Sequence, residues 1–311
     1  MAPRRPRTLL TFKAAPVRVR VPATSANLGA AFDSAGLALS LYDELVAVVT
    51  DEPGITVDIS GEGADTLPRD KRHLVAKAMI AAFDAMGAQP RGFALVTANH
   101  IPHGRGLGSS SAAIVGGIVL ARALVVGGEQ LLPDPEVLAL ASEIEGHPDN
   151  VAATLLGGFT IAWTEGTGQA YSMRPLPEIA PVVCIPHTAL ATKKARGLLP
   201  ESVPHADAAF NAARSALLVA GMTHDPALLL VATDDKLHQQ QRREAMPRSL
   251  DLVARLREAG IPAAISGAGP TVIALTTRAT ADLVAGLVGA RFDVLRLEVD
   301  TAGASVLPLD A

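Results

Sequence analysis

One stretch of the sequence combines the residue types that bind phosphate groups. Residues 104–111 have the sequence GRGLGSSS and stand directly before a long apolar run. Glycines let consecutive backbone N–H groups point into one concavity, and a helix N-terminus adds free amide donors and a partial positive charge. Serine hydroxyls can donate to phosphate oxygens or ligate Mg2+, and Arg105 adds a cation. The pattern therefore predicts a phosphate-binding loop, although a plain helix cap would explain the same residues equally well.

Three better-known loop patterns do not fit this stretch. No glycine stands five residues after Gly104 and no Lys-Ser or Lys-Thr pair follows, which excludes a Walker A loop. The glycine spacing also differs from GxGxxG. Ser110 is followed by Ser111 and Ala112, so the GxSxG nucleophile elbow of serine hydrolases is excluded as well.

A second cluster of reactive residue types occupies residues 143–150, EIEGHPDN. Glu143 and Glu145 are two residues apart, so on a helix they point about 200° apart and cannot serve one site together. Glu145 leans toward the buried side of the expected helix, where a carboxylate needs a partner such as Mg2+. Glu143 is interpreted as a surface ion pair or a C-terminal cap. Residues 148–150 alone would also fit an ordinary turn.

A second glycine loop, SGAGPT, lies at residues 266–271 between two expected strands. Glycines in such a position let the backbone approach another group closely. Taken alone, a hairpin turn is the simpler interpretation. Three polar or glycine-rich loops in one chain favour the hypothesis that they converge on one site.

The composition limits the class of protein. The chain has 311 residues, which at roughly 150 residues per domain allows two domains or one large one. With 49% hydrophobic and 19% charged residues it can form a sizeable core, and disorder is excluded. A net charge of -4 offers no electrostatic surface for nucleic acid or an acidic membrane. The single cysteine, Cys184, excludes a disulfide framework and a multi-cysteine zinc site, and it favours a cytoplasmic location.

No segment predicts a signal peptide or a membrane helix. Residues 1–13 are basic and are expected to form a disordered tail, and the apolar run within them, residues 9–12, is too short for a signal peptide. The longest uncharged stretch, residues 259–277, contains Pro262, Pro270 and three glycines. It is therefore interpreted as strand, loop and strand.

Periodicity and turn residues predict the elements that position these loops. Strands are expected at residues 17–21, 44–50, 55–60, 93–98, 159–163, 182–186, 262–266, 271–276 and 293–299. Helices are expected at residues 70–86, 112–126, 134–145, 206–222, 225–246, 250–259 and 279–288. This order indicates an α+β protein with helices on one face of a mostly antiparallel sheet. A domain boundary is expected within residues 155–185.

Together the motifs resemble those of the GHMP kinase superfamily. Residues 22–29, PATSANLG, and residues 32–37, FDSAGL, are similar to the first motif of homoserine kinases. Residues 106–112, GLGSSSA, resemble the superfamily phosphate loop, and residues 145–150 and 266–271 match the other two motifs. The motifs occur in the family's order over nearly the whole chain. The first motif and the HPDN sequence point to the homoserine kinase family in particular.

The resemblance implies a fold and an activity. The fold would be a two-domain GHMP kinase fold, with an N-terminal ATP-binding domain like that of ribosomal protein S5 at residues 14–165 and a ferredoxin-like C-terminal α/β layer at residues 166–311. The activity would be ATP-dependent phosphorylation of the side-chain hydroxyl of L-homoserine, a step toward threonine, with ATP as co-substrate and Mg2+. The partner would be this small molecule rather than nucleic acid or a membrane, and a homodimer is expected because family members are often dimers.

The resemblance also assigns roles to individual residues. ATP would contact His73, Pro102, His103, Gly104, Arg105, Gly106, Leu107, Gly108, Ser109, Ser110 and Ser111. Mg2+ would be held by Glu145 and Ser110, or else Ser109. Homoserine would contact Asn27, Asp33, His147, Arg196, Arg242 and Gly267, with Asp33 on the ammonium and the two arginines on the carboxylate.

The catalytic contacts are expected from Arg105, Asp149 and Asn150. Asn150 stands where sister kinases place an aspartate base, and an amide cannot act as a base. The hydroxyl proton is therefore expected to leave to a phosphate oxygen or to water, and a role for Asp149 stays open.

Three stretches depart from the family pattern, and one of them, Gln240 and Gln241, replaces a common Pro-Tyr before Arg242. Ala31 replaces a usual glycine and would be strained if its φ were positive. His73 stands where many members have asparagine near the adenine. Two alternatives stay open beside a homoserine kinase: another GHMP kinase for a mevalonate-pathway or sugar substrate, and a GHMP-fold ligand-binding module without catalysis.

Overall fold

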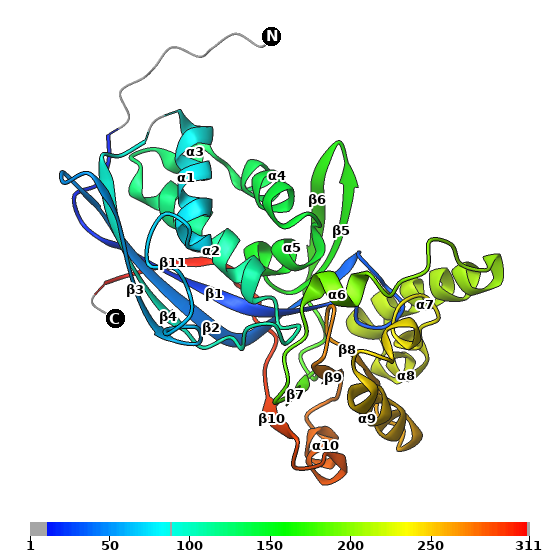
Figure 1. The fold of residues 1–311 in the computed structure, drawn as a ribbon. Coiled ribbons are helices and arrows are strands. Elements are labelled where there is room, and N and C mark those ends of the chain that lie inside the picture. The colour runs from blue at the N-terminus through cyan, green and yellow to red at the C-terminus, as the bar shows by residue number, and fades with distance from the viewer. Residues whose placement is uncertain (1–10, 88, 310–311) are drawn as a thin grey trace.

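Two β-sheets organise the chain in the computed structural model, which describes residues 11–87 and 89–309 (Figure 1). The larger sheet has seven strands in the order β11-β1-β2-β4-β3, with β5 pairing with β2 and β6. The smaller sheet has four strands in the order β10-β7-β9-β8. All pairs are antiparallel except β3 with β4. The α+β class and the mostly antiparallel pairing that the sequence predicts are confirmed.

The larger sheet is covered by helices on one face (Figure 1). Its strands are β1 (Val17–Ala26), β2 (Ala35–Thr50), β3 (Gly54–Gly61), β4 (Gly92–Asn99), β5 (Phe159–Glu165), β6 (Thr167–Met173) and β11 (Ser305–Leu307). Its helices are α1 (Leu74–Met86), α2 (Ser109–Leu124), α3 (Gly128–Leu131), α4 (Asp134–Glu145) and α5 (Asp149–Leu156). Val17, Val19 and Val21 of β1 are buried while the arginines between them are partly exposed. Burial of the alternate apolar residues thus sets which face of β1 turns to the core.

Helix α2 can lie close to its neighbours because two glycines remove side-chain bulk. A Cβ at Gly117 would come within 2.6 Å of the Val75 carbonyl oxygen on α1. A Cβ at Gly116 would press on Leu45 of β2. The close packing of α2 fixes the position of its N-terminus, where the predicted phosphate loop ends.

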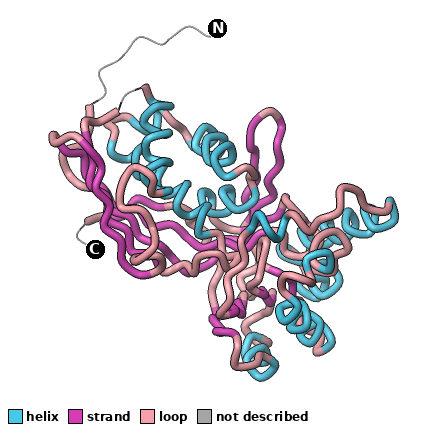
Figure 2. Tube along the Cα trace, in the orientation of Figure 1, coloured by secondary structure: helices cyan, strands magenta, loops and turns pink. Residues whose placement is uncertain are grey.

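The smaller sheet has short strands, in contrast to the long ribbons of the larger one (Figure 2). The strands are β7 (Val182–Pro186), β8 (Ala263–Ile265), β9 (Val272–Ala274) and β10 (Phe292–Arg296). The helices of this part are α6 (Thr192–Arg196), α7 (His205–Thr223), α8 (Leu229–Ala232), α9 (Pro247–Glu258) and α10 (Ala281–Leu287). Leu250, Val253 and Leu256 of α9 pack into the core that this sheet shares with it. None of the helices in the described residues has both the length and the hydropathy needed to cross a bilayer.

The helix predicted at residues 225–246 is wrong. This segment contains a 3₁₀ turn, the four-residue α8, a loop, and a second 3₁₀ turn at residues 240–242. The buried carboxylate of Asp235 accepts hydrogen bonds from the backbone N–H groups of Leu237, His238 and Gln239 at 2.8–3.1 Å. A side chain that satisfies successive backbone donors holds the chain in a loop instead of a helix.

The two ends of the described chain meet the larger sheet and its helices. Residues 11–13 of the expected tail form backbone hydrogen bonds with the end of α2, and residues 1–10 lie outside the described residues. β6 and β11 both belong to the larger sheet although they follow residue 165. The expected boundary between residues 165 and 166 stays a prediction, and the larger sheet includes strands from both sides of it.

Candidate active site

The three predicted loops converge on one cavity of about 250 Å3. It lies where the N-terminus of α2, the start of α5, α6 and the loops after β1 and β8 meet. The predicted site residues that line it are Asn27, Gly104, Gly106, Gly108, Ser109, Ser110, Glu145, His147, Asp149, Asn150, Arg196, Arg242 and Gly267. Pro102 and Leu107 are not among its lining residues, and Leu107 is buried in the core. The hypothesis of a single shared site therefore agrees with the geometry.

The loop before α2 has the backbone shape of an anion-binding site. Gly104, Gly106 and Gly108 have φ angles of 62°, 80° and 72°, which residues with a Cβ rarely adopt. A Cβ at Gly106 would also collide with the carbonyl oxygen of Ser266 in the second glycine loop. No side chain caps α2, whose N-cap is Gly108. The first amides of α2 are therefore free to donate to an anion in the cavity.

The side chain of Arg105 does not point into this cavity. Its Nε and Nη2 donate to the carbonyl oxygens of Pro186 and His187 at 2.9 and 3.0 Å, and its Nη1 donates to that of His103 at 3.3 Å. The guanidinium thus fastens the loop to the end of β7. The structure does not bring the predicted cation of Arg105 to the place where phosphate is expected.

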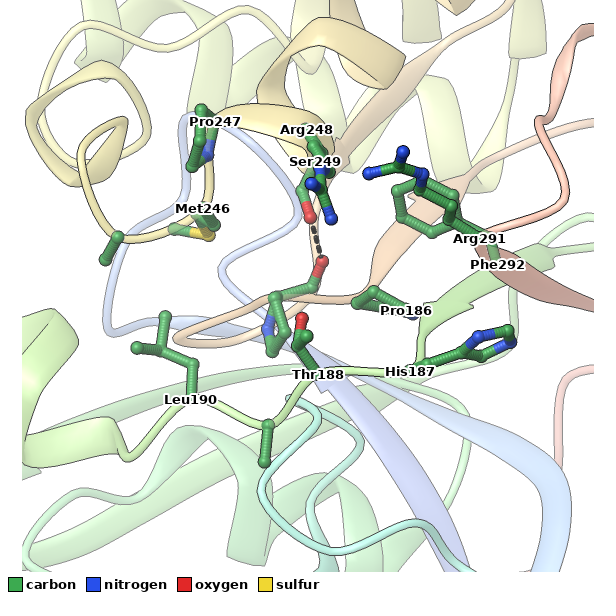
Figure 3. A pocket seen from close by; sticks show the side chains of 13 residues that line it. Pro186, His187, Thr188, Leu190, Met246, Pro247, Arg248, Ser249, Arg291 and Phe292 are labelled. Carbon is green, nitrogen blue, oxygen red and sulfur yellow. Dashed lines mark hydrogen bonds between the residues drawn. The ribbon is translucent and has the colours of Figure 1, made fainter.

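Pro186 and His187 also line a separate and larger cavity of about 370 Å3 (Figure 3). Residues 186–190, the start of α9 and the start of β10 form its walls. Ser249 and Pro270 both line this cavity, and Ser249 Oγ donates to the Pro270 carbonyl oxygen at 2.6 Å. None of the predicted site residues is among the described residues that line it. The larger cavity is therefore distinct from the candidate active site.

Replacing Arg105 with methionine is expected to lower the melting temperature and to leave the KM for ATP nearly unchanged. The substitution removes three hydrogen bonds to backbone carbonyls, and a charged hydrogen bond contributes roughly 1.5–3 kcal/mol. Thermal unfolding followed by circular dichroism measures the effect. Arg248→Met is the matched control, because Arg248 is exposed and forms no ion pair with any described residue. A normal melting temperature with a large rise in the KM for ATP would contradict the structural role.

Glu145 contacts the phosphate loop directly. Its Oε1 accepts hydrogen bonds from Ser110 Oγ at 2.6 Å and Ser111 Oγ at 3.1 Å. Glu143, two residues earlier, is exposed. A carboxylate beside a hydroxyl at an anion-binding loop is a donor set that suits Mg2+, which prefers one or two carboxylates together with substrate phosphates. Within the described residues no group of three or more His, Cys, Asp or Glu side chains could hold a metal ion, so phosphate oxygens would have to complete the shell.

His147, Asp149 and Asn150 form a hydrogen-bonded group at the start of α5. His147 Nδ1 donates to Asp149 Oδ1 at 2.6 Å, and the backbone N–H of Asn150 donates to the same oxygen at 2.8 Å. The hydrogen bond to Asp149 raises the pKa of His147. Asn150 Oδ1 accepts a hydrogen bond from Thr24 Oγ1 at 2.9 Å. Asp149 Oδ1 thus orients His147, and Asp149 also lines the cavity.

The loop after β1 is strained at the cavity. Asn27, Leu28 and Asp33 have φ angles of 69°, 45° and 53°, which cost conformational energy in residues other than glycine. Asn27 compensates with two hydrogen bonds: Nδ2 donates to the Gly267 carbonyl oxygen and Oδ1 accepts from the Asp33 N–H, both at 2.8 Å. Ala31, where strain was considered, does not have a positive φ. Two of the three residues with a positive φ, Asn27 and Asp33, are predicted substrate contacts.

Asp33 and Arg196 form a bidentate ion pair beside the cavity. Arg196 Nη2 and Nη1 donate to the two carboxylate oxygens of Asp33 at 2.7 and 3.0 Å. About a third of each side chain is exposed, at 36% for Asp33 and 34% for Arg196. The hydrogen bond with Asp33 raises the pKa of Arg196. The pair thus presents both signs of charge to a ligand.

Arg242 is a buried cation without a paired carboxylate. It is 1% exposed, and its guanidinium forms no ion pair with any carboxylate of the described residues. Nη1 donates to His238 Nδ1 at 3.2 Å and to the Gly267 carbonyl oxygen at 3.5 Å, while the buried Nε has no hydrogen-bond partner among the described residues. Burial lowers the pKa of Arg242 to about 10. A buried charge of this kind is costly until a counter-charge binds, and Arg242 lines the cavity where an anion can bind.

A smaller cavity of about 170 Å3 continues from the phosphate loop, since Ser109 and Ser110 line both. His73 and His103 also line it, together with apolar residues of α1 and α2. Both ring nitrogens of His73 are buried without a hydrogen-bond partner among the described residues. Burial lowers the pKa of His73, which favours the neutral imidazole. Such a ring can donate to and accept from a polar heterocycle.

Family models and relatives match the chain over most of its length. Residues 73–158 match the model for the GHMP kinases N terminal domain, and residues 223–293 match that for GHMP kinases C terminal. A homoserine kinase of Streptomyces avermitilis is 61% identical over 301 residues, which cover 96% of this chain and 98% of that protein. The chain belongs to the homoserine kinase family of GHMP kinases. A homoserine kinase of Streptomyces coelicolor is 60% identical over 96% of both proteins.

Solved structures confirm the fold of this family member. The homoserine kinase from Cytophaga hutchinsonii superposes with a TM-score of 0.82 at 26% identity, covering 96% of this chain and 98% of that one. The putative homoserine kinase from Listeria monocytogenes gives a TM-score of 0.75 at 32% identity, covering 94% and 99%. The two-domain GHMP kinase fold inferred from the motifs is therefore confirmed.

Three residues with contacts at this homoserine kinase family site were not singled out from the sequence. Thr24 holds Asn150, Thr192 lines the main cavity, and His238 contacts Arg242. Thr24 lies inside the first motif, and His238 stands four residues before Arg242, the second arginine expected at the substrate carboxylate. The sequence therefore indicated the neighbourhood of these two residues, but only the fold shows which side chain makes the contact.

Proposed function

We propose that the protein transfers the γ-phosphoryl group of ATP to the side-chain hydroxyl of L-homoserine, giving O-phospho-L-homoserine and ADP on the route to threonine. The observation that supports this most directly is Arg242, a buried guanidinium that lines the cavity without a carboxylate partner among the described residues. The α-carboxylate of homoserine supplies the missing charge. Asp33, about a third exposed beside the cavity, offers an anion for the α-ammonium. Galactose has neither charge, and mevalonate has no ammonium.

The nucleotide would occupy the phosphate loop and the cavity that continues from it. The amides of α2 and the loop glycines would bind the phosphates, and the small cavity at His73 would take the adenine. Glu145 and Ser110 would hold Mg2+, since a carboxylate and a hydroxyl stand beside the phosphate position. Mg2+ would neutralise charge on the transferring phosphoryl group.

The proposed reaction is an in-line displacement. The homoserine hydroxyl oxygen forms a bond to the γ-phosphorus while the bond from that phosphorus to the oxygen of the leaving ADP breaks. Asn150 orients the hydroxyl with its amide, whose Oδ1 is fixed by Thr24. Because the Asn150 amide cannot act as a base, the hydroxyl proton leaves to a phosphate oxygen or to water. The protein thus contributes positioning and charge instead of a general base.

A coupled assay of ADP release with different acceptors tests this function. The purified protein is supplied with MgATP and either L-homoserine, mevalonate, galactose or no acceptor. Turnover with homoserine well above the other three is the expected result. Turnover with mevalonate but not homoserine would contradict the proposed substrate, and ATP binding without turnover on any acceptor would favour a ligand-binding module.

Replacing Arg196 with alanine is expected to raise the KM for homoserine about tenfold and to leave the KM for ATP nearly unchanged. Its charge is partly exposed and paired with Asp33, so the loss is smaller than for a fully buried charge. Steady-state kinetics with each substrate varied in turn measures the two constants. Lys194→Ala is the matched control, because Lys194 is an exposed cation on the same helix. An unchanged KM for homoserine would remove Arg196 from the site.

We also propose a homodimer in the cytoplasm, because both are typical of the family. Light scattering coupled to size-exclusion chromatography measures the assembly, and a monomeric mass would contradict it.

A further inference from the structure

A fully buried histidine lies behind the cationic end of the candidate site. His238 has no exposed surface, and each of its ring nitrogens faces a polar partner. Nε2 lies 2.7 Å from the carbonyl oxygen of Gly29, and Nδ1 lies 3.2 Å from Arg242 Nη1. Arg242 lines the cavity, but His238 does not. Any effect of His238 on the site is therefore transmitted by the groups that it contacts, among them Arg242 and the loop that contains Gly29.

The two partners together fix which ring nitrogen is protonated. A carbonyl oxygen can only accept, so Nε2 bears the hydrogen and donates to Gly29. A guanidinium can only donate, so Nδ1 presents its lone pair to Arg242. The neutral Nε2–H tautomer satisfies both contacts, whereas a doubly protonated ring would set a donor against the Arg242 donor.

Neighbouring groups hold the ring in this orientation. Asp235 accepts from the backbone N–H of His238 at 3.1 Å and is itself held by Asn211 Nδ2 at 2.8 Å. The ring of Phe32 stacks on the histidine with 4.9 Å between the ring centroids and 24° between the planes. The ring therefore cannot turn without loss of packing and hydrogen bonds, and Nδ1 stays directed at Arg242.

The orientation matters because two like charges lie near the same aromatic ring. The guanidinium carbons of Arg196 and Arg242 lie 5.8 and 5.5 Å from the centroid of Phe32. Arg196 is held by a carboxylate, while Arg242 has only uncharged acceptors, His238 Nδ1 and the Gly267 carbonyl oxygen, both contacted by Nη1. With Nη1 occupied and Nε buried, Nη2 remains as the donor for an anion.

We propose that His238 is a positioning residue for substrate binding: its Nδ1 lone pair holds Arg242 Nη1 so that Nη2 of the guanidinium is left to donate to the substrate carboxylate. The inference rests on the proposed function, in which Arg242 binds that carboxylate. It adds to that function a residue outside the cavity, His238, that orients the guanidinium of Arg242.

Three substitutions separate the two hydrogen bonds of the ring. In His238→Asn, the amide oxygen Oδ1 can take the position of the histidine Nδ1 and so retain an acceptor for Arg242. Glutamine can place Nε2 where the ring donor stands and so retain the bond to Gly29, and leucine retains neither. His238→Gln and His238→Leu are expected to raise the KM for homoserine about tenfold or more, since a hydrogen bond to a charged group is lost. His238→Asn is expected to recover most of this loss. The KM for ATP is expected to stay within about twofold in all three.

A double-mutant cycle with Arg242→Met gives the decisive test. If His238 acts through Arg242, then His238→Gln raises the KM for homoserine in the wild-type background and has no further effect in the Arg242→Met background. Additive effects, or a rise of the KM for ATP in parallel, would overturn the positioning role and indicate general packing. Absence of wild-type turnover with homoserine would reject the proposed function itself, whereas normal turnover in His238→Gln would reject only this inference.

Discussion

Replacing Arg242 with methionine is expected to lower kcat/KM for homoserine by a few hundredfold, chiefly through the KM for homoserine. Arg242 is a buried cation that lines the cavity without a carboxylate partner among the described residues, so the substrate supplies its counter-charge. Loss of one partner of a desolvated charge pair costs roughly 2–5 kcal/mol. Steady-state kinetics with homoserine varied at saturating MgATP measures the effect.

The same substitution is expected to leave the melting temperature unchanged or to raise it. A buried charge that awaits a ligand destabilises the free protein, and an apolar side chain of similar length removes that cost. The KM for ATP is the internal control, because within the described residues Arg242 forms no hydrogen bond with the phosphate loop. An unchanged KM for homoserine in a folded Arg242→Met protein would remove the observation on which the proposed function mainly depends.

Replacing Glu145 with glutamine is expected to lower kcat by at least about a hundredfold with the fold intact. The amide keeps the size of the side chain and can still accept from Ser110, but it removes the negative charge expected to hold Mg2+. Loss of preorganised charge stabilisation at a transferring group typically reduces kcat by about 10²–10³. The dependence of the rate on Mg2+ concentration is the measurement, and the variant is expected to need more Mg2+ for half-maximal rate.

Glu143→Gln is the matched control for this experiment, because Glu143 is two residues earlier on α4 and exposed. It is expected to behave like the wild type. If Glu143→Gln lost activity and Glu145→Gln kept it, the metal role would belong to Glu143.

The sequence predicted well those features that depend on local spacing. The glycines at residues 104, 106 and 108 indicated a special backbone, and their φ angles are all positive. The inward lean of Glu145 followed from helical periodicity, and its contact with Ser110 agrees with it. Each of these inferences depends only on the spacing of residues that are close in the chain.

Features that depend on distant partners could not be predicted. Arg105 looked like a phosphate ligand because it stands in the loop, yet its partners are carbonyl groups about 80 residues later, at Pro186 and His187. The predicted helix at residues 225–246 failed because Asp235 binds backbone amides and Asn211, which the apolar pattern does not reveal. His238 became visible as a functional candidate only when folding placed it beside Gly29, 209 residues earlier.

The last strand, β11, returns the chain to the larger sheet after the smaller sheet has been formed. It pairs with β1 in the larger sheet, although residues 182–296 build the smaller sheet between them. In topological terms the smaller-sheet unit is an insertion with two connections, so the two units are not separable by a single cut. A chain truncated before β11 would expose the edge of β1 to association with other chains. β11 pairs with residues 18–20 near the start of β1, so the last strand of the chain helps to hold in the sheet the strand that leads into the strained loop at Asn27.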